Sequence, residues 1–225
     1  MHSYLIPLQH EFESVQNPEF AAGMKKYMKD QYEFYGIKTP VLRVFLKSFL
    51  KEYGLPGKNE LNAVIMECWL QEKREWQHVA IEILKRCTKN PGRDIIGLLE
   101  FMIIHKSWWD TVDDIAAWLV GPFFKKYHKM IIPKTREWMD SGNIWLQRTC
   151  LLFQLRYKNS TNTELLFGFI RELSDSKTFW IRKAIGWILR EYSKTNPDLV
   201  LKFVNSHPLS TLSRNEALKV VARKK

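Results

Sequence analysis

The stretch FWIRKAIGWILREY, residues 179–192, places apolar side chains on one face of a helix. Its apolar residues follow the i, i+3, i+4, i+7 spacing of an amphipathic helix that packs against a core, namely Ile181, Ala184, Ile185 and Ile188. The same spacing recurs in LNAVIMECWL (61–70), EWQHVAIEILKRC (75–87), DIIGLLEFMIIH (94–105), DDIAAWLVGPFF (113–124), NIWLQRTCLLFQLRY (143–157) and ELLFGFIRELS (164–174). No run alternates as a strand with hairpin turns, so the predicted fold class is all-α.

The predicted helices are separated by short turn signals. These are GLPGKN (54–59), KNPG (89–92), DSGN (140–143), KNSTN (158–162) and KTNP (194–197). None is long enough to link two domains, so we expect a single domain over residues 1–225.

A tryptophan recurs near the start of every second helix. Spacings of 33, 36 and 35 residues separate these positions, which are Trp76, Trp109, Trp145 and Trp180. Helix pairs that recur every ~34–47 residues are typical of HEAT, armadillo and related repeats, which bury their apolar faces by stacking. The sequence therefore predicts a curved α-solenoid of HEAT-like helical repeats.

The charge balance points to a polyanionic partner. The 35 Lys and Arg residues exceed the 24 Asp and Glu residues, and the formal net charge is +11. Nucleic acid or an anionic membrane surface would fit this excess, and so would a merely solvated basic surface. The sequence has neither a signal-peptide pattern nor a run of ~18 apolar residues, so we expect a cytoplasmic protein without a membrane partner.

Cysteine and histidine residues suggest no further chemistry. The cysteines lie far apart and the histidines lack metal-ligand spacing, so we expect no disulfide framework, metal or cofactor.

The repeat register predicts one shared surface. Offsets of 0, 3, 4 and 7 from the repeat tryptophan form a helical stripe, which would bring together Trp109, Asp113, Arg148 and Trp187. Asp113 occupies a slot that is small in the other repeats. Because an unpaired buried carboxylate is costly, Asp113 is either a functional group or the ion-pair partner of Arg148.

Other residues of this region have structural interpretations. Ser107 and Asp110 have the spacing of a capping box, which would assign Asp110 to a helix N-terminus. Four tryptophans fit packing between repeats better than ligand contact, namely Trp76, Trp108, Trp145 and Trp180.

Several motifs resemble a known family. They are KSWWDTVDD (106–114), NIWLQR (143–148), LLFQLRYK (151–158) and KAIGWILREYSKTNPD (183–198), and the order extends from YMK and GIKTP to LSRNEALK (212–219). The chain resembles the bacterial HEAT-like-repeat alkylpurine DNA glycosylases of the AlkD type. The resemblance implies a monomeric enzyme, without an obligate protein partner, that wraps duplex DNA on its concave face. It would hydrolyse the N-glycosidic bond of purines alkylated at N3 or N7 and leave an abasic site.

The resemblance also implies which residues form the site. The catalytic residues would be Trp109, Asp113 and Trp187, and Arg148 would contact the DNA backbone. The other expected DNA-binding residues are Tyr27, Lys38, Arg43, Arg156, Lys183 and Arg190. Two positions depart from the family pattern. Lys38 stands where the family more often has glutamine, which alters any contact to the strand opposite the lesion. Arg156 stands at a position that is basic in the family, so a phosphate contact can survive with altered geometry.

The chemistry fits these residue types. An alkylated purine is already cationic and leaves without a general acid, so a carboxylate would face the developing oxocarbenium ion. Indole faces would attract the same cation. No lysine nucleophile is evident beside Asp113, which predicts a monofunctional glycosylase. Two other functions stay open: a non-catalytic protein that recognises damaged or branched DNA, and a protein-interaction scaffold.

Overall fold

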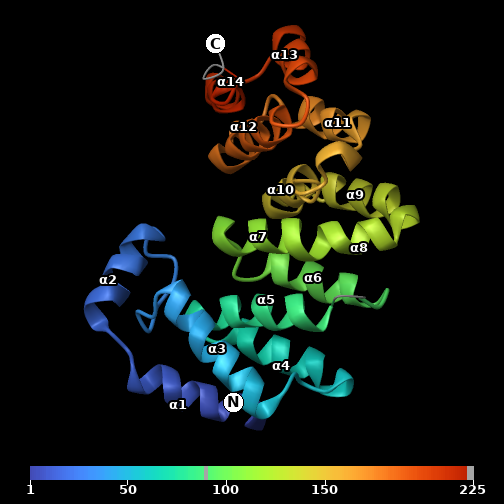
Figure 1. Cartoon of the computed structure of the whole chain (residues 1–225). Helices are drawn as coiled ribbons and strands as arrows, with labels where there is room; N and C mark the ends of the chain where they lie inside the picture. Colours follow the sequence, from blue (N-terminus) through green and yellow to red (C-terminus); the bar gives the residue numbers. More distant parts are fainter. Residues whose placement is uncertain (89–90, 222–225) are drawn as a thin grey trace. The chain divides into compact units, whose positions relative to one another are not determined.

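The structure is a computed structural model that describes residues 1–88 and 91–221, and these residues are predominantly helical (Figure 1). Within these ranges no strand forms, and the one β-type contact is an isolated bridge between Glu33 and Lys73. The all-α prediction is confirmed. No helix of the described chain is long and apolar enough to cross a membrane.

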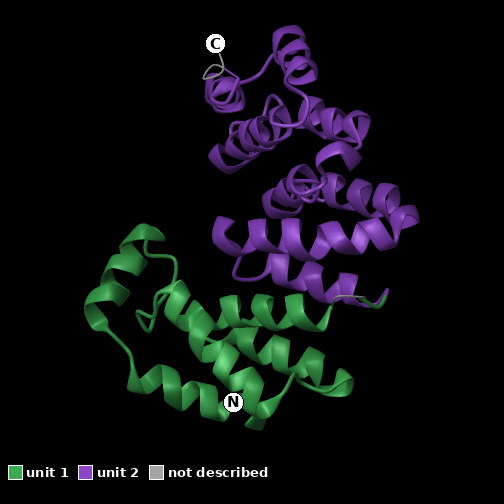
Figure 2. Ribbon diagram, in the orientation of Figure 1, with its two compact units in different colours: residues 1–92 green, residues 93–225 purple. Residues whose placement is uncertain are grey.

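The chain divides into two compact units, residues 1–92 and 93–225 (Figure 2). The prediction of one domain over residues 1–225 stays a prediction. The predicted turn KNPG includes residues 89–90, which lie outside the described residues.

Unit 1 packs its helices around a core of leucine and aromatic side chains. Its elements are η1 (Ser3–Leu5), α1 (Ile6–Ser14), α2 (Pro18–Tyr27), α3 (Thr39–Tyr53), α4 (Lys58–Leu70) and α5 (Glu75–Cys87). Trp76 is fully buried, and its ring centroid lies 5.1 Å from that of Phe12 on α1. Trp76 therefore serves the core, as predicted.

A buried carboxylate fixes the loop between α2 and α3. The side chain of Glu75 accepts hydrogen bonds from the backbone N–H groups of residues 35, 36 and 37, at 3.1, 2.9 and 3.1 Å. Gly36 adopts a φ of +89°, and a Cβ atom there would lie 2.1 Å from the carbonyl oxygen of Asn17. Only glycine fits this position, and the loop then leads into Lys38 at the start of α3.

Unit 2 stacks helix pairs, as an α-solenoid of helical repeats does. Its elements are α6 (Ile95–Ile104), α7 (Trp109–Ile115), η2 (Ala116–Val120), α8 (Gly121–Lys126), η3 (His128–Met130), α9 (Ile131–Asp140), α10 (Ile144–Leu152), η4 (Lys158–Ser160), α11 (Thr163–Leu173), α12 (Phe179–Ser193), α13 (Pro197–Ser206) and α14 (Thr211–Leu218). The second helices of successive pairs contact one another in a row, α7 on α10, α10 on α12, and α12 on α14 (Figure 1). The predicted repeat architecture is confirmed.

The predicted turn signals supply helix caps in this unit. Asn143, Asn162 and Asn196 each occupy the N-cap position of the following helix, and each side chain accepts a hydrogen bond from a backbone N–H of the first turn. An Asn cap satisfies a donor that the helix cannot. These turns therefore determine where α10, α11 and α13 begin.

The predicted helix over 113–124 contains an irregular segment. Ala116–Val120 forms a π-helical turn, η2, between α7 and α8. Pro122 lies two residues beyond its end; a proline lacks an N–H donor and its ring clashes with the carbonyl four residues earlier. A wider turn relieves this clash and lets the helix continue.

The predicted helix over 143–157 is shorter than expected, because α10 ends at Leu152. The chain then turns toward α8, where the Tyr157 hydroxyl donates to the Gly121 carbonyl at 2.7 Å. The Gln154 side chain accepts a hydrogen bond from the Asn162 N–H at 2.7 Å and donates one to the Asn162 carbonyl at 3.2 Å. These contacts replace the last helical turn.

The tryptophan that packs with those of the following repeats is Trp108, as predicted, and not the register residue Trp109. Trp108 packs with Trp145 and Trp180, at ring-centroid distances of 5.8 and 4.9 Å, whereas Trp109 begins the helix. Asp110 lies in the first turn of α7, as predicted, but Ser107 is not the N-cap residue, so the capping-box prediction is wrong. Trp108 holds the N-cap position, and the Ser107 hydroxyl donates to the Ile103 carbonyl at 2.6 Å.

The Glu75 loop yields a stability prediction. We expect Gly36→Ala to lower the free energy of unfolding by roughly 3–4 kcal/mol, because the new methyl group meets backbone at a positive φ. Gly54→Ala is the matched control. Gly54 also has a positive φ, +75°, but nothing lies within 4 Å of the place its methyl group would take, so strain alone should cost about 1–2 kcal/mol. Urea denaturation of both variants measures the difference, and equal losses would contradict the packing argument.

Candidate functional site

One cavity in unit 2 gathers most of the predicted site residues. It has a volume of about 230 Å³ and is lined by Trp109, Asp113, Arg148, Phe179, Trp180, Lys183, Trp187, Arg190 and Glu216. These side chains come from α7, α10, α12 and α14, which are the helices that form the row. Residues up to 107 positions apart in sequence therefore line the same small space.

Asp113 and Arg148 form a bidentate ion pair at the wall of this cavity. The Arg148 Nε and Nη2 atoms donate to the two carboxylate oxygens of Asp113 at 2.7 and 2.8 Å. The remaining Nη1 donates to the carbonyl oxygen of Trp180. The side chains are only 5% and 12% exposed, for Arg148 and Asp113 respectively. The pair thus joins α7, α10 and α12.

The charge of Asp113 depends on its partner. Burial raises the pKa of the Asp113 carboxyl above its ordinary value, while the hydrogen bonds and charge of Arg148 act against this rise. The nearby carboxylates of Asp110 and Asp114 add a smaller upward shift. Arg148 is therefore the group that favours an ionised Asp113 in a desolvated position.

Helix α12 contributes one continuous face to the cavity. Lys183, Trp187 and Arg190 follow the i, i+4, i+7 spacing, so the indole lies between two basic side chains. At the start of the helix Phe179 is 53% exposed and meets Trp180 edge-on, with ring centroids 5.0 Å apart. Trp180 joins the tryptophan cluster, as predicted, and it also lines the cavity, which the sequence did not predict.

Glu216 is the second residue that sequence reasoning missed. Its carboxylate is 4% exposed and bonds Lys183 at 2.9 Å, Lys219 at 2.8 Å, and Arg190. Burial alone would raise the pKa of Glu216, but its bonds to Lys219 and Lys183 and the charge of Arg190 outweigh burial and lower the pKa to about 2. In the sequence Glu216 stands in LSRNEALK, where it looks like a solvated helix residue.

Gly186 allows Glu216 to lie next to α12. A Cβ atom at Gly186 would lie 2.5 Å from the Cβ of Glu216 and 2.8 Å from the carbonyl oxygen of Ser213. The Ser213 hydroxyl also donates to the Arg182 carbonyl at 2.9 Å. Helices α12 and α14 can approach this closely only because residue 186 lacks a side chain.

The other predicted DNA-binding residues lie outside this cavity. The Arg156 guanidinium stacks on the exposed Trp118 ring, 3.4 Å from its centroid. In unit 1, Tyr27 is 69% exposed at the end of α2, and the Lys38 ammonium lies 3.8 Å above the Phe20 ring. Arg43 on α3 pairs with Glu82 at 3.9 Å. Their roles stay predictions.

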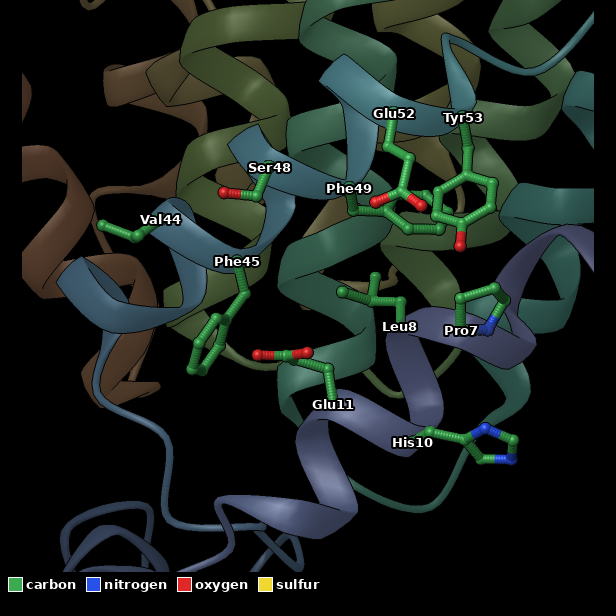
Figure 3. A pocket seen from close by; sticks show the side chains of 10 residues that line it. All are labelled: Pro7, Leu8, His10, Glu11, Val44, Phe45, Ser48, Phe49, Glu52 and Tyr53. Carbon is green, nitrogen blue, oxygen red and sulfur yellow. The ribbon is translucent and has the colours of Figure 1, made fainter.

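Unit 1 has a larger cavity, of about 520 Å³, between α1 and α3 (Figure 3). It is lined by Pro7, Leu8, His10, Glu11, Val44, Phe45, Ser48, Phe49, Glu52 and Tyr53. None of the predicted site residues is among them. The cavity of about 230 Å³ in unit 2 is therefore the candidate site.

Comparisons with known proteins identify a matching family and similar solved structures. The model of the family described as DNA alkylation repair enzyme matches residues 8–221. The solved structure of a predicted DNA alkylation repair enzyme from Enterococcus faecalis is similar, with 33% identity and a TM-score of 0.85 over 92% of this chain and 97% of that one. A search of curated proteins found no match.

More distant structures share the fold. The structure of AlkD2 from Streptococcus mutans has 19% identity and a TM-score of 0.62, over 89% of this chain and 98% of that one. The structure of smu.31 from Streptococcus mutans UA159 has 19% identity and a TM-score of 0.59, over 79% of this chain and 96% of that one.

The ion pairs of Glu216 predict a pH-dependent contribution to stability. Because the folded-state pKa of about 2 lies below the ordinary 4.5, this contribution is complete above pH 4.5 and is lost as pH falls toward 2. We expect Glu216→Gln to be less stable than the parent protein by roughly 2 kcal/mol at pH 7, since the partly exposed cations are screened by solvent.

Urea denaturation across pH 2–7 measures this difference, which should shrink as the pH falls from 4.5 to 2. Glu191→Gln is the matched control, because Glu191 is a half-buried carboxylate on α12 that pairs with Lys194 at the surface. Its effect should stay within ~0.5 kcal/mol at every pH. A Glu216→Gln difference that does not change with pH would contradict the assignment.

Proposed function

Because the chain belongs to the DNA alkylation repair enzyme family, we propose that it is a monofunctional alkylpurine DNA glycosylase. Its substrates would be purines alkylated at N3 or N7 in duplex DNA, such as 3-methyladenine and 7-methylguanine. Its products would be the free base and an abasic strand. We further propose that it acts as a monomer on nucleoid DNA in the bacterial cytoplasm, without an obligate protein partner.

One observation carries the proposal: a desolvated carboxylate lies in the same cavity as the indoles of Trp109 and Trp187. Keeping Asp113 in such a place is costly unless an interaction offsets the desolvation, and Arg148 supplies this interaction through two hydrogen bonds. A purely structural ion pair would need no aromatic cavity around it. The arrangement suits a reaction in which positive charge develops beside Asp113.

The proposed chemistry assigns two tasks to Asp113. As the N-glycosidic bond breaks, C1′ gains oxocarbenium character, and a preorganised carboxylate stabilises that charge by an amount of ~3–4 kcal/mol. Asp113 can also orient or deprotonate the attacking water. The alkylated base leaves as a neutral purine, so the reaction needs no general acid. Arg148 then acts by keeping the carboxylate charged and in place.

The indoles of Trp109 and Trp187 would hold the cationic nucleotide. Each indole face attracts a cation by ~0.5–2 kcal/mol. Trp109 precedes Asp113 by one helical turn, so indole and carboxylate occupy the same face of α7. We propose that both act on the same sugar and base.

Basic residues would bind the phosphate backbone. Lys183 and Arg190 line the cavity and remain 37% and 29% exposed, so they can donate further hydrogen bonds. Arg148 is almost fully engaged with Asp113 and Trp180, and any contact of this residue with DNA would be secondary. Arg156 and, in unit 1, Tyr27, Lys38 and Arg43 complete the proposed DNA-binding set.

A non-catalytic protein that recognises damaged or branched DNA is the second candidate, because the basic residues alone would suffice for binding. Release of free base from a methylated duplex distinguishes the two functions. A glycosylase produces alkali-labile abasic sites in duplex that carries 7-methylguanine. A protein that binds this duplex tightly without base release would be a recognition protein.

The first functional prediction concerns the charge of Asp113. We expect Asp113→Asn to lower the single-turnover rate of 7-methylguanine excision by ~10²-fold, because the amide keeps the size of the side chain but lacks its charge. Excision of 3-methyladenine should fall less, since its bond is more labile. Affinity for duplex should persist.

Asp114→Asn is the matched control, since it removes the same charge from the same helix at a residue that does not line the cavity. Its excision rate should stay near that of the parent protein. A thermal melt checks that Asp113→Asn still folds despite the buried guanidinium it leaves. If a folded Asp113→Asn excises both bases at the parental rate, Asp113 is only a structural partner of Arg148.

The second functional prediction concerns the phosphate contacts. Duplex affinity should fall steeply with salt, and Arg190→Ala should reduce the slope of log affinity against log salt by roughly one. Arg136→Ala is the control, because Arg136 lies outside the cavity and is held between Asp140 and Glu172, at 2.6 Å from each. Fluorescence anisotropy measures both slopes. Affinity that does not change with salt would remove the phosphate contacts from the proposal.

A further inference from the structure

The cavity contains a lysine that sequence reasoning did not place beside the catalytic carboxylate. Lys183 and Asp113 line the same volume of about 230 Å³. A glycosylase that leaves an abasic sugar in such a cavity exposes an aldehyde to this amine. A neutral lysine amine would condense with the aldehyde, so the predicted single activity requires something that restrains Lys183.

The restraint is Glu216. The Lys183 Nζ atom donates to Glu216 Oε2 at 2.9 Å, and Arg190 bonds Oε1 of the same carboxylate. Glu216 is buried and its low pKa keeps it ionised at neutral pH, so it always presents a full negative charge to both cations. An ammonium held in this ion pair has no lone pair for attack.

We propose that Glu216 is a positioning residue that holds Lys183 as an ion-paired ammonium and so prevents it from attacking the abasic product. This inference rests on the proposed glycosylase function, because that reaction generates the aldehyde. It also explains why a carboxylate is buried in a basic part of the cavity, where it reduces the local positive charge available to DNA.

Removal of the carboxylate should change the chemistry of Lys183. In Glu216→Gln the ammonium loses its counter-charge but keeps Arg190 and the apolar face of Trp187 as neighbours in the cavity. A cationic neighbour without a compensating carboxylate favours the neutral amine. The amine lone pair can then attack the C1′ aldehyde carbon of the ring-opened sugar, and loss of water gives an imine.

The test is borohydride trapping on a duplex that already carries an abasic site. Hydride adds to the imine carbon and solvent protonates the nitrogen, which leaves a stable amine link between protein and DNA. The parent protein should give only background trapping, and Glu216→Gln should give a yield of trapped adduct at least about tenfold higher. Because the abasic site is preformed, the readout does not require base excision by the variant. A parent protein that fails to release base refutes the proposed function, whereas absence of trapping by Glu216→Gln refutes this inference alone.

Double variants identify the reacting lysine. Glu216 also pairs with Lys219, so its removal frees two amines. Trapping should disappear in Glu216→Gln combined with Lys183→Arg and persist when it is combined with Lys219→Arg. The opposite pattern would assign the effect to Lys219 and overturn the proposal.

Glu216→Asp provides a second route if Glu216→Gln does not fold in a thermal melt. This variant keeps the charge, but its side chain is one methylene shorter and cannot hold Lys183 and Arg190 in the same geometry. We expect trapping above that of the parent protein. Background trapping by a folded Glu216→Asp that binds the abasic duplex would refute the inference.

Discussion

The buried ion pair between Asp113 and Arg148 is the interaction on which the site depends. Its two hydrogen bonds link α7 to α10, and the third donor of Arg148 reaches the Trp180 carbonyl at the start of α12. Taking two charges out of water is costly, and the cost is recovered only with well-aligned partners. The same geometry that joins three helices therefore also holds a charged carboxylate in the aromatic cavity.

Buried carboxylates recur where the fold must define backbone or side-chain positions. Glu75 orders the loop before α3 through three backbone N–H groups, and Glu216 pairs with three basic side chains from α12 and the C-cap of α14. A glycine lies near each carboxylate: Gly36 packs against the backbone of Asn17, and Gly186 lets Glu216 approach α12. In a chain of net charge +11, acids placed in this way organise the excess of basic groups.

The two carboxylates of the cavity have different surroundings and different proposed roles. Asp113 has one arginine partner and a pKa raised by burial, so its charge is sensitive to the site and can respond to a developing cation. Glu216 has three cationic partners and a pKa of about 2, which makes it a poor base and a permanent counter-ion. In these proposals environment, rather than residue type, separates the reacting carboxylate from the positioning one.

The sequence by itself determined the helical class, the repeat and the family, because apolar spacing, Asn caps and motif order are local properties. It also predicted that Asp113 would meet Arg148 or serve chemistry, and the structure shows the ion pair within the candidate site. The tertiary structure alone decided that Trp180 also lines the cavity, and that Glu216 lies beside Lys183. Helical periodicity defines which face of a helix is buried, but the partner on that face depends on how closely distant helices approach, and at Gly186 one absent side chain decides it.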